Sequence, residues 1–214
     1  MELVDQNLVE AARKALKNSQ QRNFLESVEL AINLGDVDLS DPKNRIQDEV
    51  ILPKGRGKPI KVGVFGSSEM AVKVKEVADL IIKPEEIEEI AEDKKKAKKM
   101  LAEYEFFVAE APLMPTIGKR LGVILGTTGR MPKPVPPGSD PSNIIRNLKN
   151  SVRIRTKDKP TFHVPVGTKN MSPEDIAENA EAVLKKVISK LERGKQNIRS
   201  VYIKSTMGPS VRVM

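Results

Sequence analysis

Residues that could carry enzyme chemistry are scarce in this sequence of 214 residues. It contains no cysteine and a single histidine, His163, which excludes a cysteine nucleophile, a thiolate zinc site and a His-rich metal centre. His163 lies between Phe162 and Val164 in an alternating segment with no nucleophile elbow nearby, which favours a hydrogen-bonded strand histidine. No paired carboxylates and no metal-ligand spacing stand out. We therefore expect neither catalytic residues nor a metal or cofactor.

Two glycine-rich segments invite a phosphate-binding interpretation. The segment GRGK at 55–58 is not a Walker loop, because Pro59 follows the lysine and a strand follows the loop. The segment GTTGR at 126–130 has glycines that could cradle a phosphate, but the prolines after it cannot open a helix. We expect an exposed rigid loop, carrying Arg130 and Lys133, that either touches a partner or only connects two elements. A nucleotide-dependent enzyme remains the alternative function.

The positive charge is concentrated near the end of the chain. There are 37 basic and 29 acidic residues, a net charge of +8, and positions 152–214 alone carry +7, whereas 62–151 carry +1. Such a concentrated field suits a polyanion, because each phosphate neutralised by lysine or arginine releases counterions. A solvated basic helix is the alternative explanation. The residues of that helix are Lys185, Lys186, Lys190, Arg193 and Lys195.

The segment TMGP at 206–209 is a candidate recognition surface. Gly208 lies beside Met207 and two hydroxyl residues, Ser205 and Thr206. A glycine allows an RNA backbone or ribose to approach closely, and hydroxyl groups can hydrogen bond to it. This pattern suggests RNA recognition by shape.

The two ends of the chain combine strand periodicity with two helices. Helical spacing from Val4 to position 18 predicts one amphipathic helix, and a second is expected from Ser172, its N-cap, to about Arg193, before Gly194. Alternation predicts strands at 23–32, with Glu26 on the inner face, and at 49–52, 152–155, 161–165, 201–204 and 211–213. We expect 152–155 and 161–165 to form a hairpin that turns at residues 157–159.

The middle of the chain alternates short strands with helices. The apolar run 60–65, followed by Gly66 and two serines, predicts a buried parallel strand and a helix reaching position 77. Further strands are expected at 79–82 and 105–109. Helices are expected within 84–100, where a Glu-rich start and a Lys-rich end match the order that the helix dipole prefers. A short helical turn is expected at 113–118 and another apolar segment at 121–125. This pattern predicts a small doubly wound α/β unit.

The change in pattern predicts two domains within an α/β fold class. An outer α+β domain with a split sheet, made of both termini, covers residues 1–62 and 152–214. An inserted inner, Rossmann-like α/β domain covers residues 63–151. The two chain crossings are expected near 60–66 and 148–153, with glycine at the first permitting a hinge.

Five motifs occur along the chain: FLESVE at 24–29, LPKGRGK at 52–58, GTTGRMPKP at 126–134, HVPVG at 163–167 and STMGP at 205–209. In these motifs and their order, essentially the whole chain resembles the universal large-subunit ribosomal protein L-one family, in its archaeal and eukaryotic branch. The segment after Gly126 departs from the bacterial form, which leaves the contacts of the inner domain undefined.

The resemblance implies a structural ribosomal protein, not an enzyme. It implies binding of large-subunit ribosomal RNA at the mobile stalk beside the tRNA exit site. The outer domain would bind most of this RNA, and a double hinge would join it to the inner domain. Further implied partners are exit-site tRNA, whose release in deacylated form the stalk assists, and the protein's own mRNA, whose translation many members repress. No cofactor, no membrane, a monomer off the ribosome and a cytoplasmic location are implied.

The family's RNA-contacting positions fall here on Phe24, Glu26, Ser27, Glu29, Arg155, Lys157, His163, Ser200, Thr206, Met207 and Gly208.

Overall fold

The computed structural model describes residues 6–157 and 159–214, so Val4 and Asp158, which belong to the predicted first helix and the predicted hairpin turn, lie outside the described residues. The chain folds into two compact units. One comprises Met1–Lys58 with Asn150–Met214 and is called the terminal unit here; the other comprises Pro59–Lys149 and is called the central unit. Each unit is described by itself.

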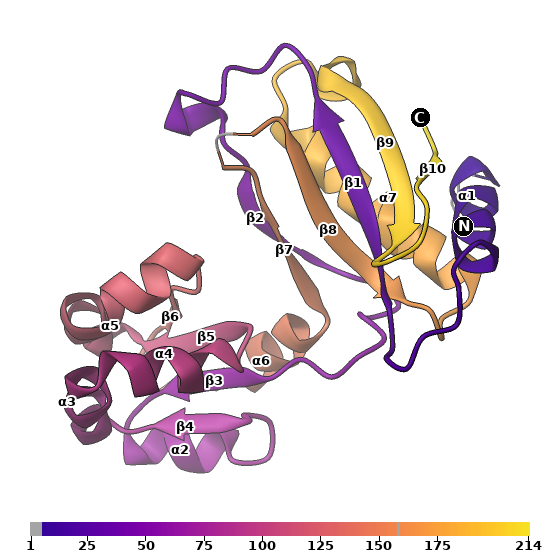
Figure 1. The fold of residues 1–214 in the computed structure, drawn as a ribbon. Helices are drawn as coiled ribbons and strands as arrows, with labels where there is room; N and C mark the ends of the chain where they lie inside the picture. The colour runs from indigo at the N-terminus through magenta and orange to yellow at the C-terminus, as the bar shows by residue number, and fades with distance from the viewer. Residues whose placement is uncertain (1–5, 158) are drawn as a thin grey trace. The chain divides into compact units, whose positions relative to one another are not determined.

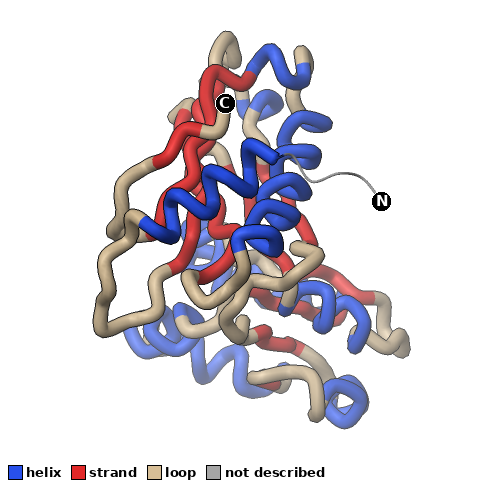
Figure 2. Tube along the Cα trace, turned by 90° about the vertical axis from the view of Figure 1, so that its right-hand side faces the viewer, coloured by secondary structure: helices blue, strands red, loops and turns tan. Residues whose placement is uncertain are grey.

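The terminal unit is built on a four-stranded antiparallel sheet of order β10-β9-β1-β8 (Figure 1). Its strands are β1 (Ser27–Leu34), β8 (Thr161–Thr168), β9 (Ile198–Ser205) and β10 (Val211–Arg212). Two helices, α1 (Gln6–Lys17) and α7 (Pro173–Lys190), pack on one side of the strands (Figure 2). The unit also contains an antiparallel pair, β2 (Gln47–Ile51) with β7 (Ser151–Arg155), and the short 3-10 helices η1 (Pro42–Asn44) and η3 (Gly194–Asn197).

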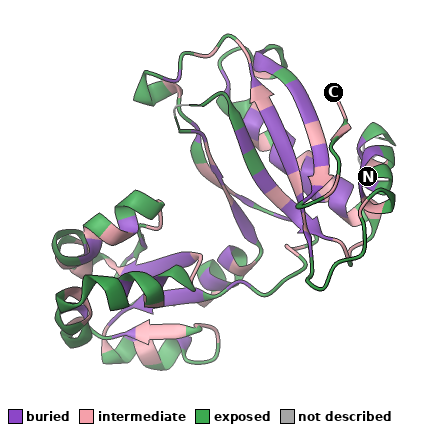
Figure 3. Cartoon of the chain, viewed as in Figure 1, coloured by how far each residue is buried: buried purple, intermediate pink, exposed green. Residues whose placement is uncertain are grey.

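One hydrophobic core lies between this sheet and its helices. Strand alternation puts Val28, Leu30 and Ile32 of β1 on the helix side, where all three are fully buried. The helix α1 meets the core with a stripe of mostly small side chains, which allow it to approach the strands closely. These are Leu8, Ala11, Ala12 and Ala15. Figure 3 shows buried residues alternating with less buried ones along the strands, so the other face of the sheet is left to polar side chains.

The helix α7 begins as the sequence predicts. The Ser172 hydroxyl accepts the Asp175 N–H at 3.1 Å, Pro173 occupies the first turn, and acidic residues there face the positive end of the helix dipole. The predicted end at Arg193 is wrong, because the helix stops at Lys190. The next residue, Leu191, is extended and buried, so core packing ends the helix before Gly194 does.

Two strand predictions for the terminal unit need correction. The first strand begins at Ser27 rather than at 23, so Phe24 is an exposed loop residue and Glu26 precedes the strand instead of lying on its inner face. The predicted hairpin of 152–155 with 161–165 is wrong. β7 pairs with β2, and β8 pairs with β1. Periodicity identifies a strand but says nothing about its partner.

The central unit has a parallel four-stranded sheet of order β4-β3-β5-β6, which confirms the predicted parallel α/β arrangement. The strands are β3 (Val62–Phe65), β4 (Leu80–Ile82), β5 (Phe106–Glu110) and β6 (Lys133–Val135). The helices are α2 (Ser68–Val74), α3 (Pro84–Glu92), α4 (Lys94–Ala102), the 3-10 turn η2 (Ala111–Leu113), α5 (Met114–Thr128) and α6 (Ser142–Lys149).

Both faces of the parallel sheet are covered. Val62 and Val64 of β3 face the core formed with α2 and α6, whereas Phe65 and Phe107 face the core formed with α3, α4 and α5. A strand buried on both sides needs apolar residues at every position. This explains why β3 appears in the sequence as an unbroken apolar run.

The segment after η2 differs from its prediction. The expected short turn at 113–118 and the apolar segment at 121–125 form one helix, α5, which ends where Gly129 adopts a left-handed conformation with φ of 71°. The expected exposed loop at 126–130 is therefore mostly the end of this helix. Arg130 is used inside the unit, since its guanidinium donates to the Ala102 carbonyl at 2.9 Å.

The predicted charge order of 84–100 is also wrong. The chain breaks at Asp93, whose carboxylate accepts the N–H groups of Lys95 and Lys96 at 3.0 Å each and so begins a new helix, α4. Lys94, Lys95 and Lys96 therefore stand in the first turn of α4, where the dipole disfavours cations, and only Lys99 stands in the last turn.

Candidate nucleic-acid interface

The polar face of the terminal unit's sheet presents three rows of side chains. Strand pairing aligns Pro165, Glu29 and Lys204 in the first row, His163, Ala31, Tyr202 and Arg212 in the second, and Thr161, Asn33 and Ser200 in the third. These positions alternate with the core positions of the same strands, so they point away from α1 and α7. The face thus offers donors, acceptors, cations and a tyrosine ring on a rigid support.

Polar contacts link neighbouring strands across this face. The Thr161 hydroxyl donates to Asn33 Oδ1 at 2.7 Å, and Asn33 Nδ2 donates to the Ser200 hydroxyl at 2.8 Å. His163 Nδ1 lies 3.5 Å from a carboxylate oxygen of Glu29, and the imidazole is half exposed. These contacts limit the rotamers of the side chains and so orient them for a ligand.

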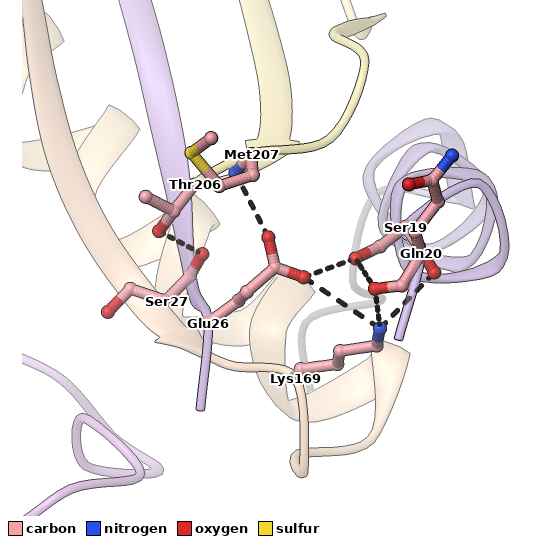
Figure 4. A network of polar contacts seen from close by, with 7 residues as sticks. All are labelled: Ser19, Gln20, Glu26, Ser27, Lys169, Thr206 and Met207. Atoms are coloured by element: carbon pink, nitrogen blue, oxygen red, sulfur yellow. Dashed lines mark hydrogen bonds and ion pairs between the residues drawn. The ribbon is translucent and has the colours of Figure 1, made fainter. Parts of the chain in front are cut away.

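At the Ser27 end of β1, Glu26 is the centre of a network that joins three segments (Figure 4). One carboxylate oxygen accepts the Met207 N–H at 3.0 Å. The other accepts the Ser19 hydroxyl at 2.6 Å and lies 3.8 Å from Lys169 Nζ, which also donates to the Gln20 carbonyl at 2.8 Å. The side chain of Glu26 is 1% exposed, so in this structure it holds the chain around Met207 in place.

The network keeps Glu26 ionised. The Ser19 hydroxyl, the Met207 N–H and the Lys169 ammonium lower the pKa of Glu26 below its ordinary value of 4.5, although burial acts in the opposite direction. A buried carboxylate of this kind is stable because its lone pairs are occupied by donors and a cation lies beside it.

Contacts to Ser27 and to Glu26 hold the loop Thr206–Gly208 in place. The N–H and hydroxyl of Thr206 both donate to the Ser27 carbonyl, at 2.9 and 3.1 Å, which fixes the hydroxyl oxygen's direction. The Met207 side chain is 60% exposed. Gly208 lies above the buried Ser205 hydroxyl, and a Cβ at Gly208 would collide with it. That hydroxyl has no hydrogen-bond partner among the described residues.

An open concavity of about 650 Å³ lies beside this loop. It is lined by Ser19, Gln21, Arg22, Asn23, Phe24, Leu25, Glu26, Lys169 and Asn170. Phe24 is 55% exposed, whereas the other four phenylalanines of the chain are buried. An exposed phenyl ring beside an arginine and several amides suits contact with an unpaired base or a ribose.

The structure brings part of the predicted set together. Phe24, Glu26, Ser27 and the loop Thr206–Gly208 surround one end of β1, with Glu29 and His163 next along the sheet. Ser200 pairs with Asn33, six residues along β1 and thus roughly 20 Å from Ser27.

Two predicted residues lie apart from that cluster. Arg155 is on β7, paired with Gln47 in the other sheet, and Lys157 lies in the connection that leads to β8. Sequence reasoning missed Ser19 and Lys169, which shape the cluster through Glu26. Lys169 is far from Glu26 in the sequence, and Ser19, seven residues before Glu26, lies outside any helix or strand whose periodicity could place the two side chains together.

The basic helix is partly neutralised within the terminal unit. Lys186 and Lys190 both lie 3.1 Å from one carboxylate oxygen of Asp48, and Lys185 lies 3.0 Å from Glu181. Burial raises the pKa of Asp48, but the Glu49 N–H and the two ammonium groups outweigh it, so that pKa lies below its ordinary value. These lysines are therefore less available to phosphate than their number suggests, while Lys195 is exposed.

The central unit offers little room for a nucleotide where parallel α/β sheets usually bind one. Strand order reverses between β3 and β5, and ligands of such sheets bind beyond the carboxyl ends of the strands at that point. Here the Ser67 hydroxyl donates to Glu110 at 2.7 Å, and the adjoining cavity measures about 70 Å³. Small-molecule sites usually measure at least about 300 Å³.

Two other kinds of site are absent from the described residues. Across 6–157 and 159–214, no helix is long and apolar enough to cross a bilayer. The same residues contain no group of three or more His, Cys, Asp or Glu side chains arranged to hold a metal ion.

Comparison with known proteins gives one consistent result. Residues 16–209 match the pattern of the Ribosomal protein L1p/L10e family. Large ribosomal subunit protein uL1 of Methanocella arvoryzae is 53% identical over 207 residues, covering 96% of this chain and 97% of that protein. The uL1 proteins of Archaeoglobus fulgidus and Thermoplasma acidophilum are each 52% identical, covering 99% and 95% of this chain and 100% and 94% of those proteins.

Proposed function

We propose, because the chain belongs to the ribosomal protein L1p/L10e family, that it binds large-subunit ribosomal RNA through the terminal unit. As a uL1 protein of archaeal type, it is a structural protein of the large ribosomal subunit, and its location is the cytoplasmic ribosome. The proposed RNA surface consists of the loop Thr206–Gly208, the concavity beside Phe24 and the polar face of the sheet.

The observation that carries this proposal is the loop held by Glu26. Recognition of RNA by shape needs polar groups whose directions are settled before binding, because ordering them later would cost conformational entropy. The Met207 N–H, donated to Glu26 at 3.0 Å, holds the loop backbone in place. The Thr206 hydroxyl donates to the Ser27 carbonyl at 3.1 Å, which leaves its oxygen lone pairs in a fixed direction to accept a hydrogen bond from RNA. The exposed Met207 side chain and Gly208 beside it allow a ribose or backbone to come close.

The finer functions rest on the resemblance. They are a place on the mobile stalk near the tRNA exit site, assistance in the release of deacylated tRNA, and repression of the protein's own mRNA. One preformed surface can bind both the ribosomal RNA and the mRNA, since an mRNA site that copies the shape of the ribosomal RNA site would fit the same loop. A monomer off the ribosome agrees with this arrangement, because the proposed surface needs no second copy.

The test is a binding measurement with Thr206→Ala and Thr206→Ser. Large-subunit ribosomal RNA is transcribed from an archaeal gene, and the fragment that the wild-type protein protects from nuclease is used for binding. An unrelated RNA duplex is the comparison. Loss of the hydroxyl is expected to weaken the specific complex by roughly 1 to 3 kcal/mol without changing its salt dependence, and serine is expected to restore affinity.

Lys195→Gln is the matched control. An exposed lysine that meets phosphate is expected to give a smaller loss on both RNAs and a shallower salt dependence. Wild-type affinity that is equal for the fragment and the duplex would contradict the proposal. An equal loss on both RNAs for Thr206→Ala would remove the loop from the recognition surface.

A further inference from the structure

A second charged surface lies on the central unit, on the outward side of α4. Ala97 and Leu101, four residues apart, are the buried residues of this helix, and Leu101 belongs to the core shared with α3 and α5. The remaining positions of the helix carry a run of lysines, all of them exposed. We call this surface the α4 lysine face; its residues are Lys94, Lys95, Lys96, Lys98 and Lys99.

The α4 lysine face has no internal counter-charge in the part of the chain that the structure describes, where none of its ammonium groups forms an ion pair. Three other lysines of the central unit are paired, whereas the scattered Lys75, Lys83 and Lys119 form no ion pair among the described residues. Lys61 lies 3.4 Å from Glu103, Lys73 lies 2.8 Å from Glu69, and Lys149 lies 3.1 Å from Asp79. The acidic helix α3 packs beside α4, yet its glutamates do not neutralise the face.

The lysines are placed where local physics disfavours them. Lys94, Lys95 and Lys96 occupy the first turn, next to the positive end of the helix dipole. Lys94 with Lys98, and Lys95 with Lys99, are like-charged pairs one turn apart, which repel each other. The Asp93 cap and the buried Ala97 and Leu101 hold the helix in spite of this. Unfavourable local choices that the rest of the structure must offset are typical of functional surfaces.

We propose that the α4 lysine face binds the phosphate backbone of RNA. The proposed function is used only to choose RNA as the polyanion. Lysine ammonium groups on flexible side chains recognise neither a base sequence nor a particular acceptor geometry, so they attract phosphates of any RNA. The face therefore adds salt-sensitive affinity for any RNA that reaches it, separate from the shape recognition proposed for the loop Thr206–Gly208.

The experiment compares two triple variants of the full chain. Lys95, Lys98 and Lys99 are each replaced by Gln in the test variant. In the control, Lys75, Lys83 and Lys119 are replaced by Gln; these are also exposed lysines of the central unit, but they lie at the end of α2, just before α3 and within α5. The charge change is the same, and glutamine keeps the helix propensity of lysine. Urea unfolding checks that both variants remain folded.

Polyuridylate and an RNA duplex of arbitrary sequence are the probes, titrated over a range of salt concentrations. The test variant is expected to show a log–log salt slope shallower by about 2 on polyuridylate, from about 0.7 for each lysine that meets a phosphate. The control variant is expected to change the slope by less than half of that. Acetylation of the wild-type protein is expected to be slowed by RNA at the lysines of α4 and not at Lys75.

The outcomes separate the two proposals. Wild-type binding with equal slopes for test and control variants, or acetylation that RNA does not slow on α4, would overturn this inference alone. Failure of the wild type to bind ribosomal RNA in the earlier test would overturn the proposed function. Retention on polyglutamate that the test variant loses, with RNA binding unchanged, would replace RNA by an acidic protein and also overturn the inference.

Discussion

Glu26 shows how a single buried charge can shape a surface that it does not itself present. Its donors come from three segments of the chain, with Ser19 on one side, Lys169 on another and the Met207 N–H above. If the carboxylate were removed, each of these donors would lose its acceptor. The residue that holds the loop in position is therefore a carboxylate inside the protein rather than one of the exposed groups proposed to bind RNA.

Glu26→Gln is expected to destabilise the protein at neutral pH, by roughly 1.5 to 3 kcal/mol, because an amide has one acceptor oxygen where the carboxylate has two. Its NH2 group must then face either the Met207 N–H or the Ser19 hydroxyl, and Lys169 loses its counter-charge. The sign of the pH dependence follows from the lowered pKa of Glu26. Its contribution is fully present above 4.5, the ordinary value, and is lost as the pH falls through the folded-state pKa. Urea unfolding of wild type and variant over this range measures the difference.

Glu174→Gln is the control for that experiment, since Glu174 is an exposed carboxylate in an ion pair with Arg13. Exposed pairs contribute at most about 1 kcal/mol, so little change is expected. A difference between wild type and Glu26→Gln that stayed constant below pH 4.5 would show that the carboxylate's charge does not hold the loop.

At the scale of elements, the connection from β9 to β10 is built around a close approach. Gly208 lies so near the Ser205 hydroxyl that only a hydrogen fits between the Cα and that oxygen. Ser205 itself is the last residue of β9 and is fully buried. The glycine in this motif is therefore required by packing inside the protein, in addition to any approach of RNA from outside.

A double-mutant cycle tests this reason. Gly208→Ala is expected to destabilise the protein by roughly 1 to 3 kcal/mol through overpacking. In the Ser205→Ala background the oxygen is gone, and the remaining Ser205 Cβ position lies 3.6 Å from the added Cβ, an ordinary contact. Gly208→Ala is then expected to cost much less, which gives a coupling energy detectable in the cycle. Additive effects in urea unfolding would show that the contact is not the cause.

At the scale of the whole molecule, each unit contributes one of the two proposed RNA surfaces. The terminal unit holds the network of Glu26 and the polar sheet face, whereas the central unit holds the α4 lysine face. The chain crosses between the units at residues 58–59 and 149–150. The first expected crossing, near 60–66, lies just after the boundary at 58–59, and the second, near 148–153, includes the boundary at 149–150; the expected hinge stays a prediction.

Removal of the central unit tests the predicted division into domains. Residues 59–149 are replaced by a short Gly-Ser linker, which is feasible because the Asn150 carbonyl accepts the Leu52 N–H at 2.9 Å, so Asn150 is held close to the segment that leads to Lys58. The shortened chain is expected to fold and to keep most of its affinity for the specific fragment. Cooperative unfolding and a binding titration are the measurements. A folded chain that no longer binds would contradict recognition by the terminal unit.

Local features of this protein were predictable from its sequence. The capped start of α7 and the apolar run of β3 follow from residue types at short spacing, and both were confirmed. The distribution of charge can be counted directly, and the polyanion that it indicates stays a prediction. The absence of cysteine and the single histidine likewise limited the chemistry without any structure. The motif at 205–209 pointed to a special loop because glycine, hydroxyl and thioether groups are adjacent there.

Only the tertiary structure decided which of these elements meet. Strand alternation is the same whether β7 pairs with β8 or with β2, and the pairing with β2 depends on a shared core that no local window contains. Likewise, Glu26 has the same neighbours in sequence whether it lies on a surface or inside. Its burial is decided by Met207, 181 residues away, and by Lys169, because a charge can be buried only where distant donors converge on it.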